Sequence, residues 1–203
     1  MILDFCNTLV RTDSYPRFIK FLFIQLGPLR SIFLRALFYL RVYLKLKKGL
    51  ELQALCGLPT KDFNQICQKF SKELNMHTNK EVLNFARECA NDGYSIIVLS
   101  GALSNYIECY LNVISLESQV IAKRIDETKK SISLDNKEFI YGPIKLEEFK
   151  KNVKINRNST KIISIGDSST DLDILYYADE KIVMKDSDKA LLEIAKEKSW
   201  RVL

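Results

Sequence analysis

Histidine, glycine and proline are all scarce in this sequence, and its cysteines form no Cys-x-x-Cys pair. The single histidine, His77, argues against metal sites built from several histidines. Seven glycines and four prolines among 203 residues exclude collagen-like and low-complexity chains. The five cysteines are an odd, scattered set, which argues against a disulfide framework or a structural zinc site and fits the reducing cytoplasm.

Long uncharged apolar runs are missing as well. None approaches the ~18 residues that a membrane-spanning helix needs. The start, Met1-Ile2-Leu3-Asp4, lacks the basic region and apolar run of a secretory signal. With 47% hydrophobic and 28% charged residues, the composition excludes general disorder. The length suits one globular domain with an inserted segment.

Acidic residues are absent between Ser14 and Leu50, where eight Lys or Arg residues occur. The remainder of the chain carries 23 basic and 25 acidic residues, so the net charge of +6 belongs to this one segment. In a helix that turns by about 100° per residue, four of its basic side chains fall in one narrow stripe. They are Arg30, Arg41, Lys45 and Lys48.

This basic segment has two interpretations. One is a pair of helices that packs its apolar face and solvates its basic face. The other is contact with an anionic membrane surface, through apolar insertion and attraction of Lys and Arg to the lipid. The protein would then be cytoplasmic but peripheral at the membrane. Aromatic–basic stacking motifs are missing, so we expect no nucleic-acid partner.

Short apolar runs alternate with helical patterns in most of the chain, which predicts an α/β protein with a parallel sheet and right-handed crossovers. Residues 119–134 show weak strand alternation, typical of a hairpin or of edge strands. The helical block between the first two strands has the position of an insertion. We expect strands at 1–5, 95–99, 161–165 and 181–184, and helices at 15–48 (interrupted at Gly27-Pro28), 60–74, 79–91, 103–112, 145–153, 172–178 and 190–197.

Reactive side chains occur at the carboxyl ends of predicted strands or at the starts of predicted helices. The segments that carry them are 4–8, 100–101, 145 and 166–171. Ligands bind at this edge of a doubly wound sheet, so we expect these segments to meet. Asp4, Asp167 and Asp171 would supply the hard oxygen ligands that suit Mg²⁺. Each of them alone is also typical of a turn or a helix cap.

Groups suited to a phosphate accompany these carboxylates. Thr8 and Ser100 supply hydroxyls, and the backbone N–H groups beside them, as at Gly101, can bind phosphate oxygens. Lys145 would neutralise the carboxylate cluster and a transferring phosphoryl group. Together these residues predict a phosphate site beside a magnesium site.

These segments resemble the four motifs of the haloacid dehalogenase (HAD) superfamily, and within it the phosphoserine-phosphatase-like branch. The first motif, Asp-x-Asp-Gly-Thr-Leu, corresponds to Asp4-Phe5-Cys6-Asn7-Thr8-Leu9. The second, a strand ending in Ser or Thr, corresponds to Ile97-Val98-Leu99-Ser100-Gly101. The third, Gly-x-x-Lys, matches Gly142-Pro143-Ile144-Lys145. The fourth, Gly-Asp-Ser-x-x-Asp, matches Gly166-Asp167-Ser168-Ser169-Thr170-Asp171 and is the most specific of the four.

The resemblance spans nearly the whole chain and implies a HAD-type doubly wound parallel sheet with a helical cap inserted after the first strand. The core would comprise residues 1–11 and 79–203, and the cap residues 12–78. A cap that lies over the site would supply substrate selectivity from side chains near Arg11, Asp13 and Arg17. Of these we expect Arg17 to bind the substrate.

The resemblance also implies an activity, the Mg²⁺-dependent hydrolysis of a phosphate monoester on a small substrate. Asp4 would be the nucleophile that forms an aspartyl-phosphate. Lys145 and the Ser100 hydroxyl would hold the phosphoryl group, with Thr8 and Gly101 beside them.

The magnesium site implied by the resemblance uses the same first motif. Mg²⁺ would lie between the Asp4 carboxylate, the backbone carbonyl of Cys6 and the Asp167 carboxylate. Asp171 would complete the acidic site.

Cys6 departs from the family's first motif, whose second Asp is the general acid and base. A thiol has a pKa near ~8.5 and is a poor substitute for a carboxylate. Losing a positioned acid or base typically costs roughly 10²–10⁴-fold in rate. Three functions remain open: a slow or restricted phosphatase, a binding or regulatory module without hydrolysis, and displacement of a halide, which needs no proton. A phosphatase acting on lipid phosphates at an anionic membrane surface is a variant of the first.

Overall fold

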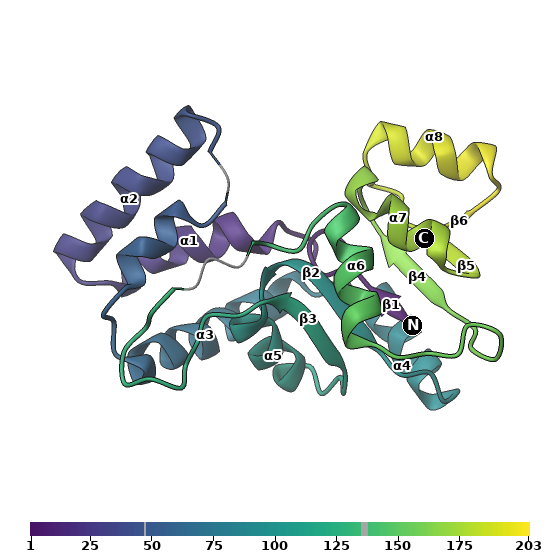
Figure 1. Ribbon diagram of the computed structural model, residues 1–203, viewed down its shortest axis with the longest axis horizontal. Coiled ribbons are helices and arrows are strands. Elements are labelled where there is room, and N and C mark those ends of the chain that lie inside the picture. Colours follow the sequence, from purple (N-terminus) through teal and green to yellow (C-terminus); the bar gives the residue numbers. More distant parts are fainter. Residues whose placement is uncertain (47, 135–137) are drawn as a thin grey trace.

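A parallel β-sheet forms the centre of the computed structural model, which describes residues 1–46, 48–134 and 138–203 (Figure 1). All strand pairs in this sheet are parallel, as the sequence predicts. The order across the sheet is β3 (Gln119–Lys123), β2 (Ile97–Leu103), β1 (Ile2–Leu3), β4 (Ile163–Gly166), β5 (Glu180–Val183) and β6 (Arg201–Val202).

Strand β1 lies in the middle of the sheet although it comes first in the chain. Ile2 is opposite Ile97 of β2 on one side and Ser164 of β4 on the other. Successive side chains of a strand point to opposite faces, and Ile2 and Leu3 accordingly enter two different hydrophobic clusters. This central position puts Asp4, the next residue, at the carboxyl edge of the sheet.

Helices cover both faces of the sheet (Figure 1). α4 (Lys80–Asn91) and α5 (Ser104–Val113) share a cluster with Leu3 and Val98 on one face. α6 (Pro143–Asn152) and α7 (Leu172–Tyr177) share a cluster with Ile2, Ile97 and Leu99 on the other. α8 (Lys189–Glu197) packs its Leu191 against Val183 of β5. The doubly wound α/β architecture is confirmed.

The inserted block between β1 and β2 begins with two helices at the left-hand end of the molecule (Figure 1). The block consists of α1 (Ser14–Gln25), α2 (Pro28–Tyr43), the 3-10 helix η1 (Leu50–Leu55), α3 (Thr60–Leu74) and the 3-10 turn η2 (Asn75–His77), before α4 starts. Asp13 caps α1 by accepting a hydrogen bond from the Tyr15 N–H. Pro28 lies at the first position of α2, where its missing N–H costs nothing.

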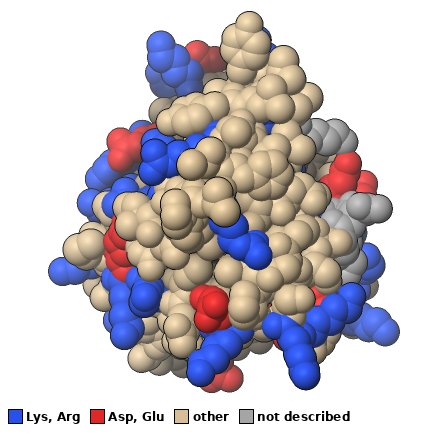
Figure 2. Space-filling view, turned by 90° about the vertical axis from the view of Figure 1, so that its left-hand side faces the viewer, with Lys and Arg blue, Asp and Glu red and all other residues tan. Residues whose placement is uncertain are grey.

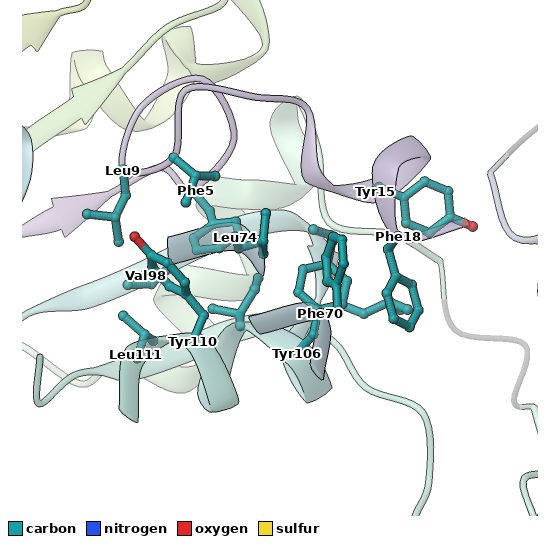
Figure 3. Close-up of a cluster of buried hydrophobic side chains, with 14 of the residues drawn as sticks. Phe5, Leu9, Tyr15, Phe18, Phe70, Leu74, Val98, Tyr106, Tyr110 and Leu111 are labelled. Atoms are coloured by element: carbon teal, nitrogen blue, oxygen red, sulfur yellow. The ribbon is translucent and has the colours of Figure 1, made fainter. Parts of the chain in front are cut away.

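An aromatic cluster joins this block to the sheet (Figure 3). The ring of Tyr106, on α5, lies 4.8 Å from the ring of Phe18 on α1 and 5.1 Å from that of Phe70 on α3. Such pairs add stability beyond the apolar area that they bury. The apolar interior therefore continues across the expected boundary between the 12–78 cap and the 1–11 and 79–203 core, and that division stays a prediction.

Several boundaries differ from those that the sequence predicts. The helix expected to reach residue 48 ends at Tyr43, because the backbone turns at Lys45, whose φ is 51°. The expected stripe of basic residues is wrong for the same reason: Lys45 and Lys48 lie beyond the helix. β2 continues through Ser100 and Gly101 with a register shift instead of ending there.

Two further segments also differ. Residues 119–134 form the parallel edge strand β3 and then a loop with two isolated antiparallel bridges, one between Asp126 and Ser133 and one between Ser131 and Pro59. The edge-strand interpretation is confirmed for β3. β6 follows α8 and is not predicted, because two exposed residues carry no apolar pattern. None of the helices within the described ranges is long and apolar enough to cross a membrane.

Candidate active site

Three carboxylates meet at the carboxyl edge of the sheet. Asp4 follows β1, Asp167 follows β4, and Asp171 ends the 3-10 turn η3 (Ser169–Asp171) that comes next. One oxygen of each lies within 4.8 Å of the others. The expected convergence of these three residues is therefore present in the structure.

Lys145 lies in the first turn of α6 and joins two of these carboxylates. Its Nζ donates to Asp4 Oδ1 at 2.6 Å and to Asp171 Oδ1 at 2.5 Å. The side chain is almost completely buried, so both ion pairs are shielded from water. Such charge-assisted bonds are about twice as strong as neutral ones.

Gly166 permits the close approach of Asp171 to the end of β4. A Cβ at position 166 would lie 2.7 Å from Asp171 Oδ2, closer than real contacts allow. The same Oδ2 accepts from the N–H groups of Asp167 and Ser168 at 3.3 Å. Both oxygens of Asp171 are thus committed, one to the loop that carries Asp167 and one to Lys145.

The cluster carries an excess of negative charge. Burial is the largest effect on Asp4 and raises its pKa, Lys145 opposes this, and the two other carboxylates raise it further. Burial and Asp171 also raise the pKa of Asp167. Burial alone would lower the pKa of Lys145, but the attraction of Asp4 and Asp171 outweighs it, so that pKa is raised and the ammonium stays charged. A divalent cation beside Asp4 and Asp167 would balance this charge.

The hydroxyl groups expected to contact phosphate lie around the carboxylates. Thr8 is fully buried and its Oγ1 donates to Asp167 Oδ1 at 3.5 Å. The Ser100 Oγ accepts from the Ala102 N–H at 3.2 Å. A Cβ at Gly101 would lie 3.1 Å from the Ile140 carbonyl oxygen, so this glycine lets the segment before α6 approach β2.

Asn7 and Cys6 form the turn after Asp4. Asn7 adopts a left-handed φ of 52°, which asparagine tolerates better than most residues. The Cys6 Sγ lies 3.1 Å from Ser14 Oγ, which in turn lies 2.9 Å from the Tyr106 hydroxyl. Burial, with the charge of Asp4 beside it, raises the pKa of the Cys6 thiol to about 12. At neutral pH the thiol therefore keeps its proton.

A cavity of about 530 Å³ opens over these groups. The predicted residues that line it are Asp4, Cys6, Asp13, Ser100, Gly101, Lys145 and Asp167. Further lining residues are Asn7, Arg41, Lys45, Leu46, Lys48, Tyr141, Ser168 and Thr170. The cavity therefore combines an acidic floor with a basic wall.

Arg17 is not among the lining residues, contrary to the expectation for it. Its guanidinium pairs with Glu73 of α3 at 3.1 Å. Arg11 is likewise engaged elsewhere, since it donates to the Asn79 side chain at 3.1 Å. The basic wall comes instead from the end of α2 and the turn after it, where Arg41 pairs with the buried Glu51 at 3.0 Å.

The sequence indicates that this segment is basic but does not predict that its lysines line the cavity. Lys45 and Lys48 belong to the segment without acidic residues, and a continuous helix would have placed them on its solvent-exposed side. The left-handed backbone at Lys45 ends that regularity. No local pattern predicts Tyr141 as a lining residue.

Comparison with known proteins gives a family match over most of the chain. A family described as haloacid dehalogenase-like hydrolase matches residues 1–175. No curated protein matches the chain in sequence.

Solved structures share the fold at low sequence identity. A protein of unknown function from Bordetella pertussis Tohama I is 14% identical, with a TM-score of 0.80 over 100% of this chain and 96% of that chain. A HAD family hydrolase from Salmonella enterica serovar Typhi is 16% identical, with a TM-score of 0.64 over 100% and 65%. A phosphoserine phosphohydrolase-like protein from Francisella tularensis is 20% identical, with a TM-score of 0.60 over 100% and 93%.

Proposed function

Since the chain belongs to the haloacid dehalogenase-like hydrolase family, we propose that it hydrolyses phosphate monoesters of small molecules with Asp4 as the nucleophile. One observation carries this proposal: the buried Lys145 ammonium bridges Asp4 and Asp171 beside Asp167, below a cavity with a basic wall. Phosphoserine phosphatases and a phosphoserine phosphohydrolase-like protein share this fold. The same arrangement has no evident use in a purely structural role, because burying the carboxylates of Asp4 and Asp171 beside a third, that of Asp167, costs stability.

The donor set of the site fits Mg²⁺. Asp4 and Asp167 offer carboxylate oxygens close together, and the backbone carbonyl of Cys6 would complete the set. Asp171 has both oxygens committed, so its role is to position Lys145 and the Asp167 loop. When bound, the ion would screen the charge of the phosphate and of the nucleophile.

The residues of the chain account for a two-step reaction. The Asp4 carboxylate attacks phosphorus, the bond to the leaving oxygen breaks, and an aspartyl-phosphate forms. Water then attacks that phosphorus and releases inorganic phosphate and the free Asp4 carboxylate. Lys145 and the Ser100 region neutralise and orient the phosphoryl oxygens in both steps. These groups require no movement of the sheet, because they already surround one cavity.

Cys6 limits the protonation of the leaving oxygen. A thiol whose pKa is about 12 can give a proton only reluctantly and cannot remove one from water at neutral pH. Turnover should therefore be slow for substrates with poor leaving groups and faster for activated ones.

The first experiment measures phosphate release from an activated aryl phosphate by the wild type and Asp4→Asn, with and without Mg²⁺. An aryl leaving group needs little protonation and bypasses the deficit at Cys6. We expect Mg²⁺-dependent release that Asp4→Asn abolishes while its thermal unfolding still shows a folded protein. Release that is unchanged in Asp4→Asn would rule out the proposed nucleophile.

A second function has one observation in its favour, the protonated thiol of Cys6. In that case the chain is a binding or regulatory module that holds a phosphorylated ligand without turning it over. Absence of phosphate release together with saturable binding of inorganic phosphate and Mg²⁺ would establish this function. We also propose a cytoplasmic location, since five scattered cysteines without a Cys-x-x-Cys pair fit a reducing compartment.

A further inference from the structure

The outer face of α2 is apolar over its whole length. Leu29, Ile32, Phe33, Leu40 and Tyr43 recur at helical spacing and fall on one side of the helix. Leu29 and Tyr43, near its two ends, are 85% and 84% exposed, and the others are exposed too. An ordinary surface helix has charged side chains on its solvent-exposed side. Here apolar side chains are exposed to water instead, which solvation disfavours.

The three arginines of α2 lie off this face. Arg30 donates to the backbone carbonyls of Ala54 and Cys56, and Arg41 pairs with Glu51. Arg35 lies at the edge, with its guanidinium 5.1 Å from the centre of the Phe23 ring. The apolar stripe is thus uninterrupted by charge.

Exposed apolar residues also occur in the chain just before and just after α2. Ile24, at the end of α1, is 78% exposed, and Leu44, directly after α2, is 50% exposed. Figure 2 shows this end of the molecule as a broad tan area with more blue than red around it. Contiguous apolar patches of this kind mark interaction sites in proteins that otherwise bury such side chains.

The segment that carries the apolar face has charged residues of one sign. Between Ser14 and Leu50 there are eight Lys or Arg residues and no Asp or Glu. Lys20 and Arg35 are exposed on the two helices. Lys45 and Lys48, which follow α2, are exposed too but line the candidate active-site cavity. An apolar stripe flanked by cations is the pattern of helices that lie in an anionic membrane interface, where each basic residue near the surface adds about 1 kcal/mol.

We propose that α2 docks on the surface of an anionic lipid bilayer, with its axis along the membrane plane and its apolar face inserted. The 16 residues of α2 make a contact about 24 Å long. An amphipathic helix in this position inserts its apolar side chains by about 5–10 Å. The helix pair lies at one end of the molecule, so docking does not require the sheet to approach the lipid (Figure 1).

A second copy of the chain is a poorer occupant of the same face. A two-fold contact brings the same patch together from both copies. The cations of one patch would then meet the cations of the other, because the segment offers no acidic partner. Anionic lipid satisfies the apolar and the charged parts together.

The test is co-sedimentation of the full chain with two kinds of vesicles, phosphatidylcholine alone and phosphatidylcholine with about 30% phosphatidylglycerol. We expect binding to the anionic vesicles only. Leu29→Ser/Ile32→Ser should lower the ratio of bound to free protein roughly tenfold, because two exposed apolar side chains leave the contact. The matched control, Met76→Ser/Val113→Ser, changes exposed apolar residues elsewhere and should bind like the wild type.

A second measurement uses tryptophan fluorescence to report insertion of the α2 face into the bilayer, in a variant that still binds vesicles. Phe33→Trp in a Trp200→Phe background puts the chain's single tryptophan on the proposed face. Its emission should shift to shorter wavelength with anionic vesicles, whereas the native Trp200 should show no shift. Arg35→Glu/Lys20→Glu should weaken binding, and added salt should weaken the wild type in the same way.

Three results of these vesicle experiments would overturn the proposal. They are binding to anionic vesicles no greater than to neutral ones, equal loss of binding in the Leu29→Ser/Ile32→Ser variant and its control, and an unshifted emission at position 33. A dimer in sedimentation velocity that Leu29→Ser/Ile32→Ser dissociates would also overturn it, since a second copy would then cover the face.

Discussion

At the scale of single residues, the cavity contains a thiol where a carboxylate would serve the proposed chemistry better. Cys6 lies against Ser14, and Ser14 against Tyr106, so its surroundings are built from neutral hydroxyls. The hydrogen bond to Ser14 lowers the pKa of the Cys6 thiol, but burial and the charge of Asp4 raise it by more. The thiol is thereby kept protonated beside the nucleophile.

Replacing this thiol tests its role directly. Cys6→Asp should raise the turnover of alkyl phosphates by roughly 10²–10⁴-fold, because a carboxyl group can protonate the leaving oxygen and then activate water. Aryl phosphates should change little. The measurement compares kcat for both substrates, with Cys6→Asn as the control of similar size. Equal rates for the Asp and Asn variants with alkyl phosphates would contradict the assignment.

The excess negative charge at Asp4 also predicts a pH dependence of stability in protein without metal. Folding raises the Asp4 pKa above its ordinary value near ~3.9, so the folded state keeps a proton that the unfolded chain releases. The stability contribution is full below that ordinary value and is lost as the pH rises through the folded pKa.

Asp4→Asn should remove this loss of folding stability at high pH, because asparagine carries no ionisable group. In chelator, the variant should unfold roughly 2–4 °C above the wild type at pH 8, with a smaller difference at pH 5. Mg²⁺ should raise the unfolding temperature of the wild type at pH 8 and leave that of Asp4→Asn nearly unchanged. A difference that is the same at both pH values would show that Asp4 ionisation does not govern it.

At the scale of elements, the junction after β4 depends on a contact that only glycine allows. Gly166 faces the Asp171 side chain, whose two oxygens hold the Asp167 loop and Lys145. Gly166→Ala should cost about 1–3 kcal/mol of unfolding free energy by overpacking and should weaken Mg²⁺ binding. Urea unfolding and a Mg²⁺ titration measure the two effects.

Gly27→Ala is the matched control for this change. A Cβ at Gly27 meets nothing within 4 Å, and the residue only caps α2. We expect it to cost less than about 1 kcal/mol and to leave Mg²⁺ binding unaltered. Similar Mg²⁺ affinity in both variants would show that Asp171 tolerates displacement.

The same elements show how far the sequence predicts the fold. The strands around Ile97 and Ile163 are predicted because both of their faces are buried, which gives short continuous apolar runs. The helices around Phe70 and Leu191 are predicted because one buried face imposes a helical period on the residues. The end of α2 is not, because Lys45 adopts a left-handed conformation that no local pattern requires. β6 escapes prediction because its pairing with β5, rather than its own residues, makes it a strand.

At the scale of the whole molecule, some residues of the candidate site are predictable from the sequence and others are not. Asp4, Lys145 and Asp167 are predicted because each follows a strand or starts a helix at one edge of the sheet. Arg17 pairs with Glu73 of α3 and does not line the cavity, because its position depends on how α1 packs against α3. Contacts between elements distant in sequence leave no local signal.

The basic wall of the cavity leads to a prediction about substrate affinity. Lys45→Gln/Lys48→Gln should raise KM for a phosphorylated substrate roughly tenfold with little change in kcat, because these cations line the cavity and attract the substrate, whereas Lys145 is the cation that pairs with the nucleophile. Arg17→Gln should leave both constants unchanged. Steady-state kinetics with the aryl phosphate decide this, and a KM effect confined to Arg17→Gln would restore the original expectation.

The central position of β1 determines when the sheet can be completed during synthesis. β1 leaves the ribosome first, yet its neighbours β2 and β4 follow only after the inserted helices and much of the remaining chain. Contacts between distant segments form slowly, whereas α1, α2 and α3 can pair with near neighbours at once. Asp4 can therefore reach its place beside Asp167 only after β4 has been synthesised, later than the inserted helices can pair with one another.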